Sequence, residues 1–275
     1  MRRKSRIINI GGVLIGGGNP VAVQSMTNTD TRNVEATVAQ ILALEKQGCQ
    51  IVRVAVVDQE AAGAIKQIKA RISIPLIADI HFDYRLALAG AKAGADALRL
   101  NPGNIGETSR VREVVAVCKD RGIPIRIGVN AGSLEKDLLL KYKSICAEAM
   151  LESALRHTEI LESMGFDSIK VSLKASSVLL TIAAYRLMAE KTDYPLHIGI
   201  TEAGTAERAL IKSALGIGIL LLDGIGDTVR VSLTGSPVDE VWAAYEILRA
   251  LGVGVFWVLA TTLGGIALFR RAEIK

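Results

Sequence analysis

The stretch QIVRVAVVDQEAAGAIKQIKARISIPLIADIH, residues 50–81, carries the pattern that decides the fold of this 275-residue chain. Two short runs rich in branched apolar residues, Gln50–Val56 and Pro75–His81, flank the amphipathic segment Gln59–Ala70. A strand, a helix and a second strand of these lengths form a βαβ unit, in which the two strands are parallel. The stretch therefore predicts one repeat of an α/β fold.

The same alternation continues in both directions along the chain. We expect strands at Val21–Met26, Gln50–Val56, Pro75–His81, Ala97–Asn101, Pro124–Asn130, Ser168–Lys174, Pro195–Glu202 and Asp227–Leu233. A helical pattern follows each strand, at Val34–Gln47, Gln59–Ala70, Tyr84–Ala93, Thr108–Arg121, Ala147–Met164, Ser177–Lys191, Ala206–Leu221 and Pro237–Leu251. Eight such pairs over about 230 residues are typical of a (β/α)8 TIM-like barrel. A doubly wound sheet would place a glycine-rich loop after the first strand, where this chain has Ser25-Met26-Thr27-Asn28.

Residues 1–20 precede the barrel pattern. Two short apolar runs joined by Gly11-Gly12 predict a β-hairpin that closes the bottom of the barrel. The basic start resembles a signal peptide, but Asn9 and the glycine pair interrupt its apolar run, and no small-residue cleavage site follows before Gln24. We therefore divide the chain into a hairpin (1–20), a substrate-binding barrel (21–251) and a short apolar tail (252–275).

Composition excludes several classes of protein. A hydrophobic fraction of 50% is too high for a disordered chain, and an aromatic fraction of 4% argues against a nucleic-acid binder that stacks bases. Cys49, Cys118 and Cys146 form neither a disulfide framework nor a zinc motif, so we expect a cytoplasmic protein. The uncharged run Leu251–Phe269 is long enough to span a bilayer, but its glycines and threonines also suit turns. We favour a barrel without a membrane anchor.

Polar residues occupy the predicted strand ends, where TIM barrels carry their chemistry. They are Arg53, Asp79, His81, Arg99, Asn101, Arg126, Asn130, Ser172, Lys174, His197, Thr201, Glu202, Arg230, Ser232 and Thr234. Side chains alternate along a strand, so most of these share the face toward the barrel interior; for His197 the orientation stays open. A lone arginine in a strand is usually solvated, but cations at equivalent positions of five strands are not explained in that way.

Four arginines and one lysine would therefore converge in the barrel, namely Arg53, Arg99, Arg126, Lys174 and Arg230. Buried cations need anionic partners, and only Asp79 and Glu202 oppose them in the pattern. The planar guanidinium matches phosphate oxygens. The sequence thus predicts a small substrate with two or more phosphates.

Three residues are candidates for catalysis. Glu202 can act as general acid or base, or can only neutralise a neighbouring cation. Asp79 and His81 can position substrate or move a proton, or form a structural hydrogen bond at the rim. His157 lies in a helical pattern, and we expect it on the surface.

With these residues in place, the chain resembles the 4-hydroxy-3-methylbut-2-enyl diphosphate synthase family of the non-mevalonate isoprenoid pathway, from about Arg6 to Leu251. The matching motifs are Asn19-Pro20-Val21, Val23–Thr29, Ala78–Phe82, Arg99–Gly106, Arg126–Leu134, Val171–Ser176, Thr201–Gly204 and Gly224–Leu233. Ordered motifs of this length are far more specific than a shared fold.

The resemblance implies an oxidoreductase that opens and dehydrates 2-C-methyl-D-erythritol 2,4-cyclodiphosphate with electrons from flavodoxin or ferredoxin. Glu202, Asp79 and His81 would be catalytic. The substrate would be bound by Arg53, Arg99, Asn101, Arg126, Asn130, Ser172, Lys174, Thr201, Arg230 and Ser232. The family's electrons pass through a 4Fe–4S cluster, held by three Cys and one Glu on a second domain that closes over the barrel of the other subunit in a homodimer.

The chain departs from the family where that second domain begins. The family has a C-x-x-C-G-R signature there, and this chain has Ala260–Gly265 without a cysteine. None of its three cysteines lies in a family ligand motif, so we predict no metal ligands here. We expect a truncated, substrate-binding barrel without redox activity on its own. A partner subunit for a cluster-bearing chain and a membrane-anchored barrel are the alternatives.

Overall fold

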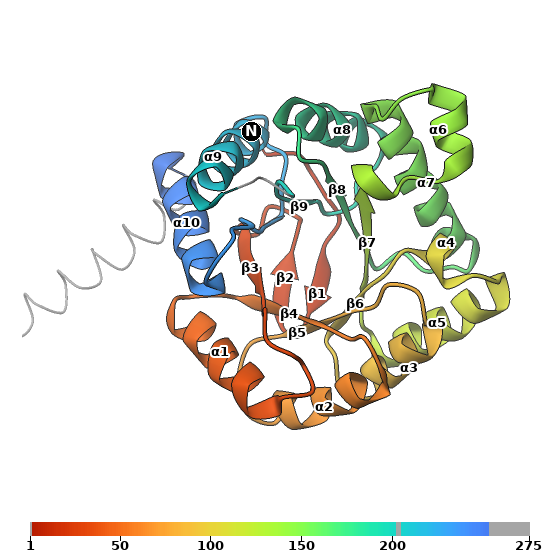
Figure 1. The fold of residues 1–275 in the computed structure, drawn as a ribbon. Coiled ribbons are helices and arrows are strands. Elements are labelled where there is room, and N and C mark those ends of the chain that lie inside the picture. Colours follow the sequence, from red (N-terminus) through yellow and green to blue (C-terminus); the bar gives the residue numbers. More distant parts are fainter. Residues whose placement is uncertain (1, 202–204, 253–275) are drawn as a thin grey trace, which may run out of the picture.

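The computed structural model describes residues 2–201 and 205–252, and its main sheet is a barrel (Figure 1). The parallel strands follow one another in the order β8-β7-β6-β5-β4-β3-β10-β9, and a bridge between Val171 and Leu196 joins the two ends. The strands are β3 (Ala22–Met26), β4 (Ile51–Ala55), β5 (Leu76–Asp79), β6 (Ala97–Arg99), β7 (Ile125–Asn130), β8 (Ile169–Lys174), β9 (His197–Ile198) and β10 (Thr228–Val229). The predicted TIM barrel is confirmed.

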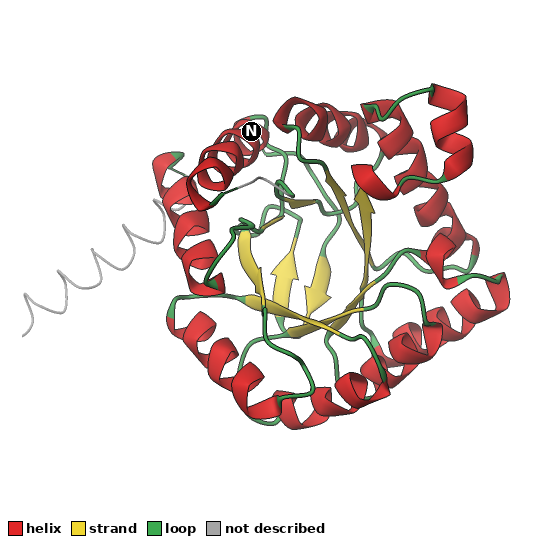
Figure 2. Cartoon of the chain, in the orientation of Figure 1, coloured by secondary structure: helices red, strands yellow, loops and turns green. Residues whose placement is uncertain are grey.

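Helices form a ring outside the strands (Figure 2). The ring consists of α1 (Val34–Lys46), α2 (Gln59–Lys69), α3 (Tyr84–Lys92), α5 (Thr108–Arg121), α7 (Ala147–Ser163), α8 (Val178–Lys191), α9 (Ala206–Leu222) and α10 (Pro237–Ala250). Side chains of Asn33, Asp58 and Ser177 accept hydrogen bonds from the first turns of α1, α2 and α8, which fixes where these helices begin. The pattern did not predict three short elements, α4 (Pro102–Ile105), η1 (Ala131–Ser133) and α6 (Lys136–Tyr142), which follow β6 and β7.

The last two strands are shorter than their patterns. β9 and β10 have two residues each, although the predicted strands Pro195–Glu202 and Asp227–Leu233 have eight and seven. At Gly199, directly after β9, a Cβ would lie 2.4 Å from the carbonyl oxygen of Arg230, so the backbones of these two segments approach closely where the strands end.

A small hairpin closes the bottom of the barrel, as predicted. Its strands, β1 (Ile8–Ile10) and β2 (Val13–Ile15), pair antiparallel and are joined by Gly11 and Gly12, both with positive φ. Three isoleucines of the hairpin pack against residues of β3, β4, β5 and β6 that lie toward the strand starts. This bottom cluster consists of Ile8, Ile10, Ile15, Ala22, Ile51, Ile77 and Ala97. Their burial removes apolar surface from water and blocks this end of the barrel.

Residues 2–6, the N-terminal arm, tie the hairpin to the far end of the chain. The amide of Arg3 donates to Gly224 O at 2.9 Å, and the amide of Arg6 donates to Asp193 O at 2.8 Å. Ser5 Oγ donates to Asp227 Oδ1 at 2.9 Å. The arm therefore holds the segments that lead into β9 and β10.

The membrane question concerns mainly the run 251–269, most of which lies outside the described residues. Within residues 2–201 and 205–252, no helix combines the length and the apolar character needed to cross a membrane.

Candidate active site

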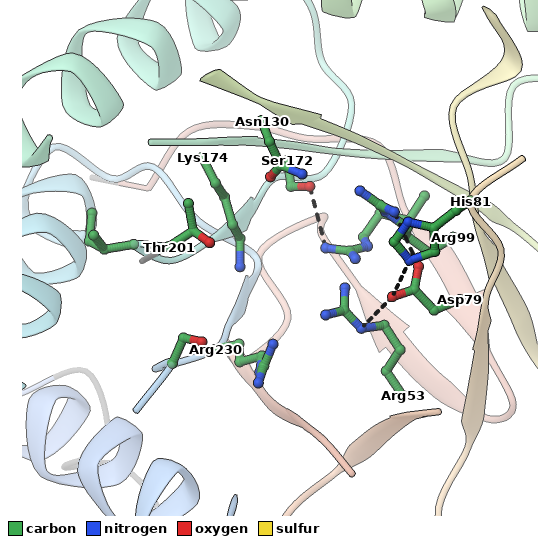
Figure 3. Close-up of a pocket in the computed structure, with 12 residues that line it drawn as sticks. Arg53, Asp79, His81, Arg99, Asn130, Ser172, Lys174, Thr201 and Arg230 are labelled. Carbon is green, nitrogen blue, oxygen red and sulfur yellow. Dashed lines mark hydrogen bonds and ion pairs between the residues drawn. The ribbon is translucent and has the colours of Figure 1, made fainter. Parts of the chain in front are cut away.

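A cavity opens at the carboxyl ends of the strands (Figure 3). About 520 Å³ of empty space lies in and over it, part of which is open solvent. The cavity is lined by Arg53, Asp79, His81, Arg99, Arg126, Asn130, Ser172, Lys174, Ile200, Thr201, Arg230 and Ser232. The structure thus brings together the predicted site residues on seven strands and the segments that follow them. Two predicted residues are not in the lining: Asn101, and Glu202, which lies outside the described residues.

Asp79 is the acidic centre of one side of the cavity. Its Oδ1 lies 3.2 Å from Arg99 Nη1, and its Oδ2 lies 3.5 Å from Arg53 Nε and 3.7 Å from His81 Nε2. Burial alone would raise the pKa of this carboxyl, but Arg53, the hydrogen bond with His81, Arg99 and Arg126 together hold the pKa far below its ordinary value. Such a group is ionised at neutral pH and has no proton to donate, so the geometry favours a positioning and charge-balancing role for Asp79.

Asn101 lies behind the cavity wall. Its Nδ2 donates to Gly128 O at 2.9 Å, and its Oδ1 accepts from Gly128 N at 2.8 Å. Arg99 Nη2 also donates to Gly128 O, at 3.2 Å. A Cβ on Gly128 would lie 2.7 Å from Arg99 Nε, so this glycine makes room for the guanidinium. Asn101 therefore fixes the end of β6 against β7, and its predicted contact with substrate stays a prediction.

Arg230 has a buried partner that the sequence analysis missed. Glu240, on the first turns of α10, accepts from Arg230 Nε and Nη2 at 3.1 Å each, and only 4% of the residue is exposed. Its position inside an amphipathic helix gave no signal, because acidic residues near a helix start are common on solvated faces.

Arg126 and Lys174 have no carboxylate within ion-pair distance in the described part of the chain. Arg126 Nη1 donates to Ser172 Oγ at 3.3 Å, and Lys174 Nζ lies 3.4 Å from His197 Nε2. Burial first, and then the like charges around them, lower the pKa of both cations well below the ordinary values. Both groups would gain greatly from an anion in the cavity.

Below the cavity the barrel interior stays polar. His197 is directed inward, with Nδ1 2.8 Å from Thr228 Oγ1, which answers the question that its sequence left open. Burial and the charge of Lys174 lower its pKa well below the ordinary value, so the ring is neutral. Lys170 is also fully buried, and its Nζ, like both polar atoms of the Gln24 side chain, has no hydrogen-bond partner among the described residues. The sequence analysis did not identify this polar layer.

The expectation that His157 lies on the surface is wrong. The residue is 4% exposed, and its Nδ1 accepts from the amide of Gly103 at 3.2 Å. Its Nε2 lies 3.2 Å from Glu135 Oε1. The helical pattern of α7 has buried residues on two sides, because α4 and α6 cover a face that would otherwise meet solvent.

The cysteines do not form a cluster site within residues 2–201 and 205–252. Cys49 follows α1, Cys118 lies within α5 and Cys146 precedes α7. Burial raises the pKa of Cys49 to about 11 and that of Cys118 to about 12, whereas iron–sulfur ligands must be thiolates. No group of three or more His, Cys, Asp or Glu side chains in this part of the chain could hold a metal ion. These residues therefore do not fit a 4Fe–4S cluster.

The fold and the cavity together define a TIM-barrel protein with a cationic site at the carboxyl ends of its strands. Residues 5–245 match the GcpE TIM-barrel domain. The chain belongs to this family, whose curated members are 4-hydroxy-3-methylbut-2-en-1-yl diphosphate synthases of the isoprenoid pathway.

Two relatives illustrate the similarity. The chain is 61% identical over 253 residues to the 4-hydroxy-3-methylbut-2-en-1-yl diphosphate synthase (flavodoxin) of Caldanaerobacter subterraneus, covering 92% of this chain and 71% of that enzyme. It is 63% identical over 251 residues to the enzyme of the same name from Thermodesulfovibrio yellowstonii, covering 91% and 72%. The chain therefore spans about seven tenths of the length of these relatives.

Solved structures at lower identity share the fold. Dihydropteroate synthase from Stenotrophomonas maltophilia superimposes with a TM-score of 0.62 at 18% identity, covering 88% of this chain and 98% of that one. Phospho-2-dehydro-3-deoxyheptonate aldolase from Thermotoga maritima gives 0.65 at 11% identity, covering 90% and 75%. At these identities the likeness shows the barrel alone.

Proposed function

We propose that the cavity binds 2-C-methyl-D-erythritol 2,4-cyclodiphosphate, the substrate implied by the family resemblance, and holds it for reductive ring opening and dehydration to 4-hydroxy-3-methylbut-2-enyl diphosphate. The observation that carries the proposal is the charge of the lining. Five cations, Arg53, Arg99, Arg126, Lys174 and Arg230, face Asp79 and the helix-borne Glu240. The excess of positive charge matches a diphosphate.

The two cations without a carboxylate partner among the described residues indicate where a phosphate would bind. Arg126 and Lys174 come from the neighbouring strands β7 and β8, and both are buried. A phosphate between them would supply the negative charge that the described protein groups do not. Ser172, already bonded to Arg126, and Asn130 add neutral hydrogen-bond donors beside this position.

Glu202 is the proposed proton donor to the departing hydroxyl. It follows Thr201, which lines the cavity, and a carboxyl group beside a substrate can exchange a proton with a hydroxyl. Asp79 is the weaker candidate for this role because neighbouring cations keep it ionised. His81, with a side chain 56% exposed at the mouth, would contact the substrate or move a proton there.

The described residues supply binding and not electron transfer. Flavodoxin appears in the names of the relatives, and we propose it as the electron donor of the complete reaction. Since residues 2–201 and 205–252 do not fit a 4Fe–4S cluster, the cluster would be held outside them. We propose that these 275 residues bind substrate without turnover, and that cluster ligands outside the described residues supply the redox half, which a cluster-bearing relative can provide in a mixture.

Calorimetric titration of the purified chain with the cyclodiphosphate tests the binding step. We expect binding to the wild type and a loss of about 1.5–3 kcal/mol in Arg126→Ala, the contribution of a charge-assisted contact. Equal affinity in the two proteins would overturn the proposal.

Absorption spectra after anaerobic iron–sulfur reconstitution test the redox step. A cluster band with turnover in the chain alone would refute the second part, whereas turnover only after mixing with a cluster-bearing relative would support it.

A further inference from the structure

His157 connects two loops at the carboxyl end of the barrel. The amide of Gly103, in the turn α4 that follows β6, donates to its Nδ1 at 3.2 Å. Its Nε2 lies 3.2 Å from Oε1 of Glu135, the residue before α6 in the segment that follows β7. One buried side chain of the outer helix α7 thus holds two neighbouring strand-end connections.

The contacts fix the tautomer of the ring. A backbone N–H can only donate, so Nδ1 must carry a lone pair and the proton of the neutral ring must be on Nε2. The Nε2–H then donates to Glu135 Oε1, which also accepts from Ser153 Oγ at 3.1 Å. Nδ1 therefore accepts a hydrogen bond from the loop after β6, and Nε2 donates one to the segment after β7.

Gly103 shows how closely the ring and the first loop approach. A Cβ at this position would lie 2.6 Å from His157 Cε1 and 3.2 Å from Nδ1. The φ of Gly103 is not in the left-handed region, so the backbone itself tolerates other residues. The absence of a side chain at 103 therefore serves the contact with His157.

The two loops begin at the wall of the cavity. The first starts at Asn101, whose amide brackets the backbone of Gly128, and Gly128 is the residue against which Arg99 lies. The second starts after Asn130, which lines the cavity. A change in the spacing of the loops would therefore shift Arg99 through the hydrogen bonds of Asn101 and Gly128, and Asn130 through the chain itself.

We propose that His157 is a positioning residue for the diphosphate substrate: through the Nδ1 contact with Gly103 and the Nε2 contact with Glu135 it sets the spacing of the loops 101–106 and 131–135. The inference rests on the proposed function for the identity of the ligand, but its structural half does not. His157 is not among the residues that line the cavity, so its effect on substrate passes through the loops.

The charges around the ring give the proposal a pH dependence. Burial lowers the pKa of His157, the neighbouring Glu135 raises it and Arg156 lowers it. Arg156 is itself paired with Asp137 of α6 and Glu152 of α7, and α4 contributes no charged side chain. Protonation would place a second donor at Nδ1 opposite the Gly103 amide. Because burial is the largest of these effects, the pKa of His157 lies below the ordinary histidine value of about 6.5, and loop 101–106 should loosen as the pH falls below that value.

Two substitutions separate the two nitrogens. His157→Asn places a carbonyl oxygen near the position of Nδ1 and keeps an acceptor for Gly103, whereas His157→Gln places its amide near Nε2 and keeps the group that faces Glu135. Thr158→Val is the matched control, since Thr158 is equally buried on the same helix and its hydroxyl donates only to Leu155 O within the helix.

Hydrogen exchange followed by mass spectrometry measures the protection of the loop amides, and calorimetry with the cyclodiphosphate measures the affinity for the substrate. We expect protection of peptide 101–106 to fall about fivefold or more in His157→Gln and less in His157→Asn, the loss of one buried hydrogen bond. Affinity should fall in the same order, and Thr158→Val should leave both readings as in the wild type. Equal protection in the two His157 variants, or unchanged protection in both, would overturn the proposal.

A pH series keeps the test decisive if His157→Gln does not fold. Protection factors of peptide 101–106 in the wild type should decrease on acidification, and those of His157→Asn, which has no ring to titrate, should not. Parallel curves would refute the proposal. Failure of the wild type to bind cyclodiphosphate would refute the proposed function alone, because the exchange measurements need no ligand.

Discussion

The guanidinium of Arg230 and the carboxylate of Glu240 form a two-point ion pair, in which Nε and Nη2 lie 3.1 Å from Oε2 and Oε1. The same carboxylate accepts from Ser25 Oγ and from the amide of Leu233, at 3.1 Å each. One acid on α10 thus orients a cavity cation and ties the helix to β3 and to the segment after β10. Arg230 is therefore neutralised from outside the barrel, and it needs less from a ligand than Arg126 does.

Removal of Glu240 should be costly for stability. Glu240→Ala leaves Arg230, whose side chain is 14% exposed, without its carboxylate partner, and breaking a largely buried ion pair in this way costs about 3–5 kcal/mol. Urea unfolding should show the loss as a lower midpoint. Glu246→Ala is the control, because this half-exposed residue of the same helix pairs with Arg249 alone among the described residues and should change the stability by less than about 0.5 kcal/mol. Equal midpoints for Glu240→Ala and wild type would contradict the analysis.

Arg126 should show the opposite balance between stability and binding. Arg126→Met replaces a buried cation that lacks a carboxylate by an apolar side chain of similar length, so we expect the ligand-free protein to become more stable. Its affinity for the cyclodiphosphate should fall at least about tenfold. Thermal unfolding and calorimetry on the same preparation measure both effects, with the exposed Arg112→Met of α5 as a control that changes neither. A destabilised Arg126→Met would show that the charge is already compensated.

Gly128 should be required for the position of Arg99. In Gly128→Ala the new methyl group would lie 2.7 Å from Nε and 2.9 Å from Nη2, so the guanidinium must leave its contact with Asp79. We expect weaker binding of the cyclodiphosphate and a stability loss of about 1–3 kcal/mol from overpacking. Gly132→Ala provides the comparison, since nothing lies within 4 Å of its Cβ position. Calorimetric titration of both variants decides, and wild-type affinity in Gly128→Ala would argue against the role of Arg99.

Asp79 should make the stability depend on acid pH. Although burial opposes it, the arginines and His81 hold the pKa of Asp79 below that of the unfolded chain, near 4, so the folded protein binds fewer protons. The stabilisation is present above about pH 4 and is lost as the pH falls further. Asp79→Asn should be less stable than wild type at pH 7 and should give a flatter curve between about pH 5 and 2. Urea unfolding across this range, with the exposed Asp120→Asn as control, would show parallel curves if the idea is wrong.

Most residues of the cavity could be predicted because the alternation that places them can be seen within single strands of the sequence. Arg53, Arg99 and Arg126 stand in strands whose alternation fixes which side chains face inward. The parallel register brings Asp79, Arg99 and Arg126 to one level, and Arg53 lies two residues nearer the start of its strand. The barrel followed from the same repetition. The hairpin could be predicted because its two apolar runs and glycine pair are contiguous.

The rest depends on contacts between distant segments. Glu240 reaches Arg230 from a helix, and His157 is buried only because α4 and α6 cover it. Asn101 shares a strand face with Arg99, but β6 ends at Arg99, so the alternation no longer determines where the Asn101 amide points. Gly128 carries no functional group, and its importance appears only when the Arg99 side chain is in place.

The N-terminal arm imposes an order on the folding of the nascent chain. Residues 2–6 leave the ribosome well before their partners Asp193, Gly224 and Asp227, which stand in the segments that lead into β9 and β10. β9 and β10 contribute only two paired residues each, so the arm adds contacts where the ring has few. Until these segments are synthesised, the arm lacks its partners and the hairpin covers a barrel without its last strands. We therefore expect the barrel to close late in the synthesis of this domain, and a ribosome-associated chaperone to meet the partly built barrel.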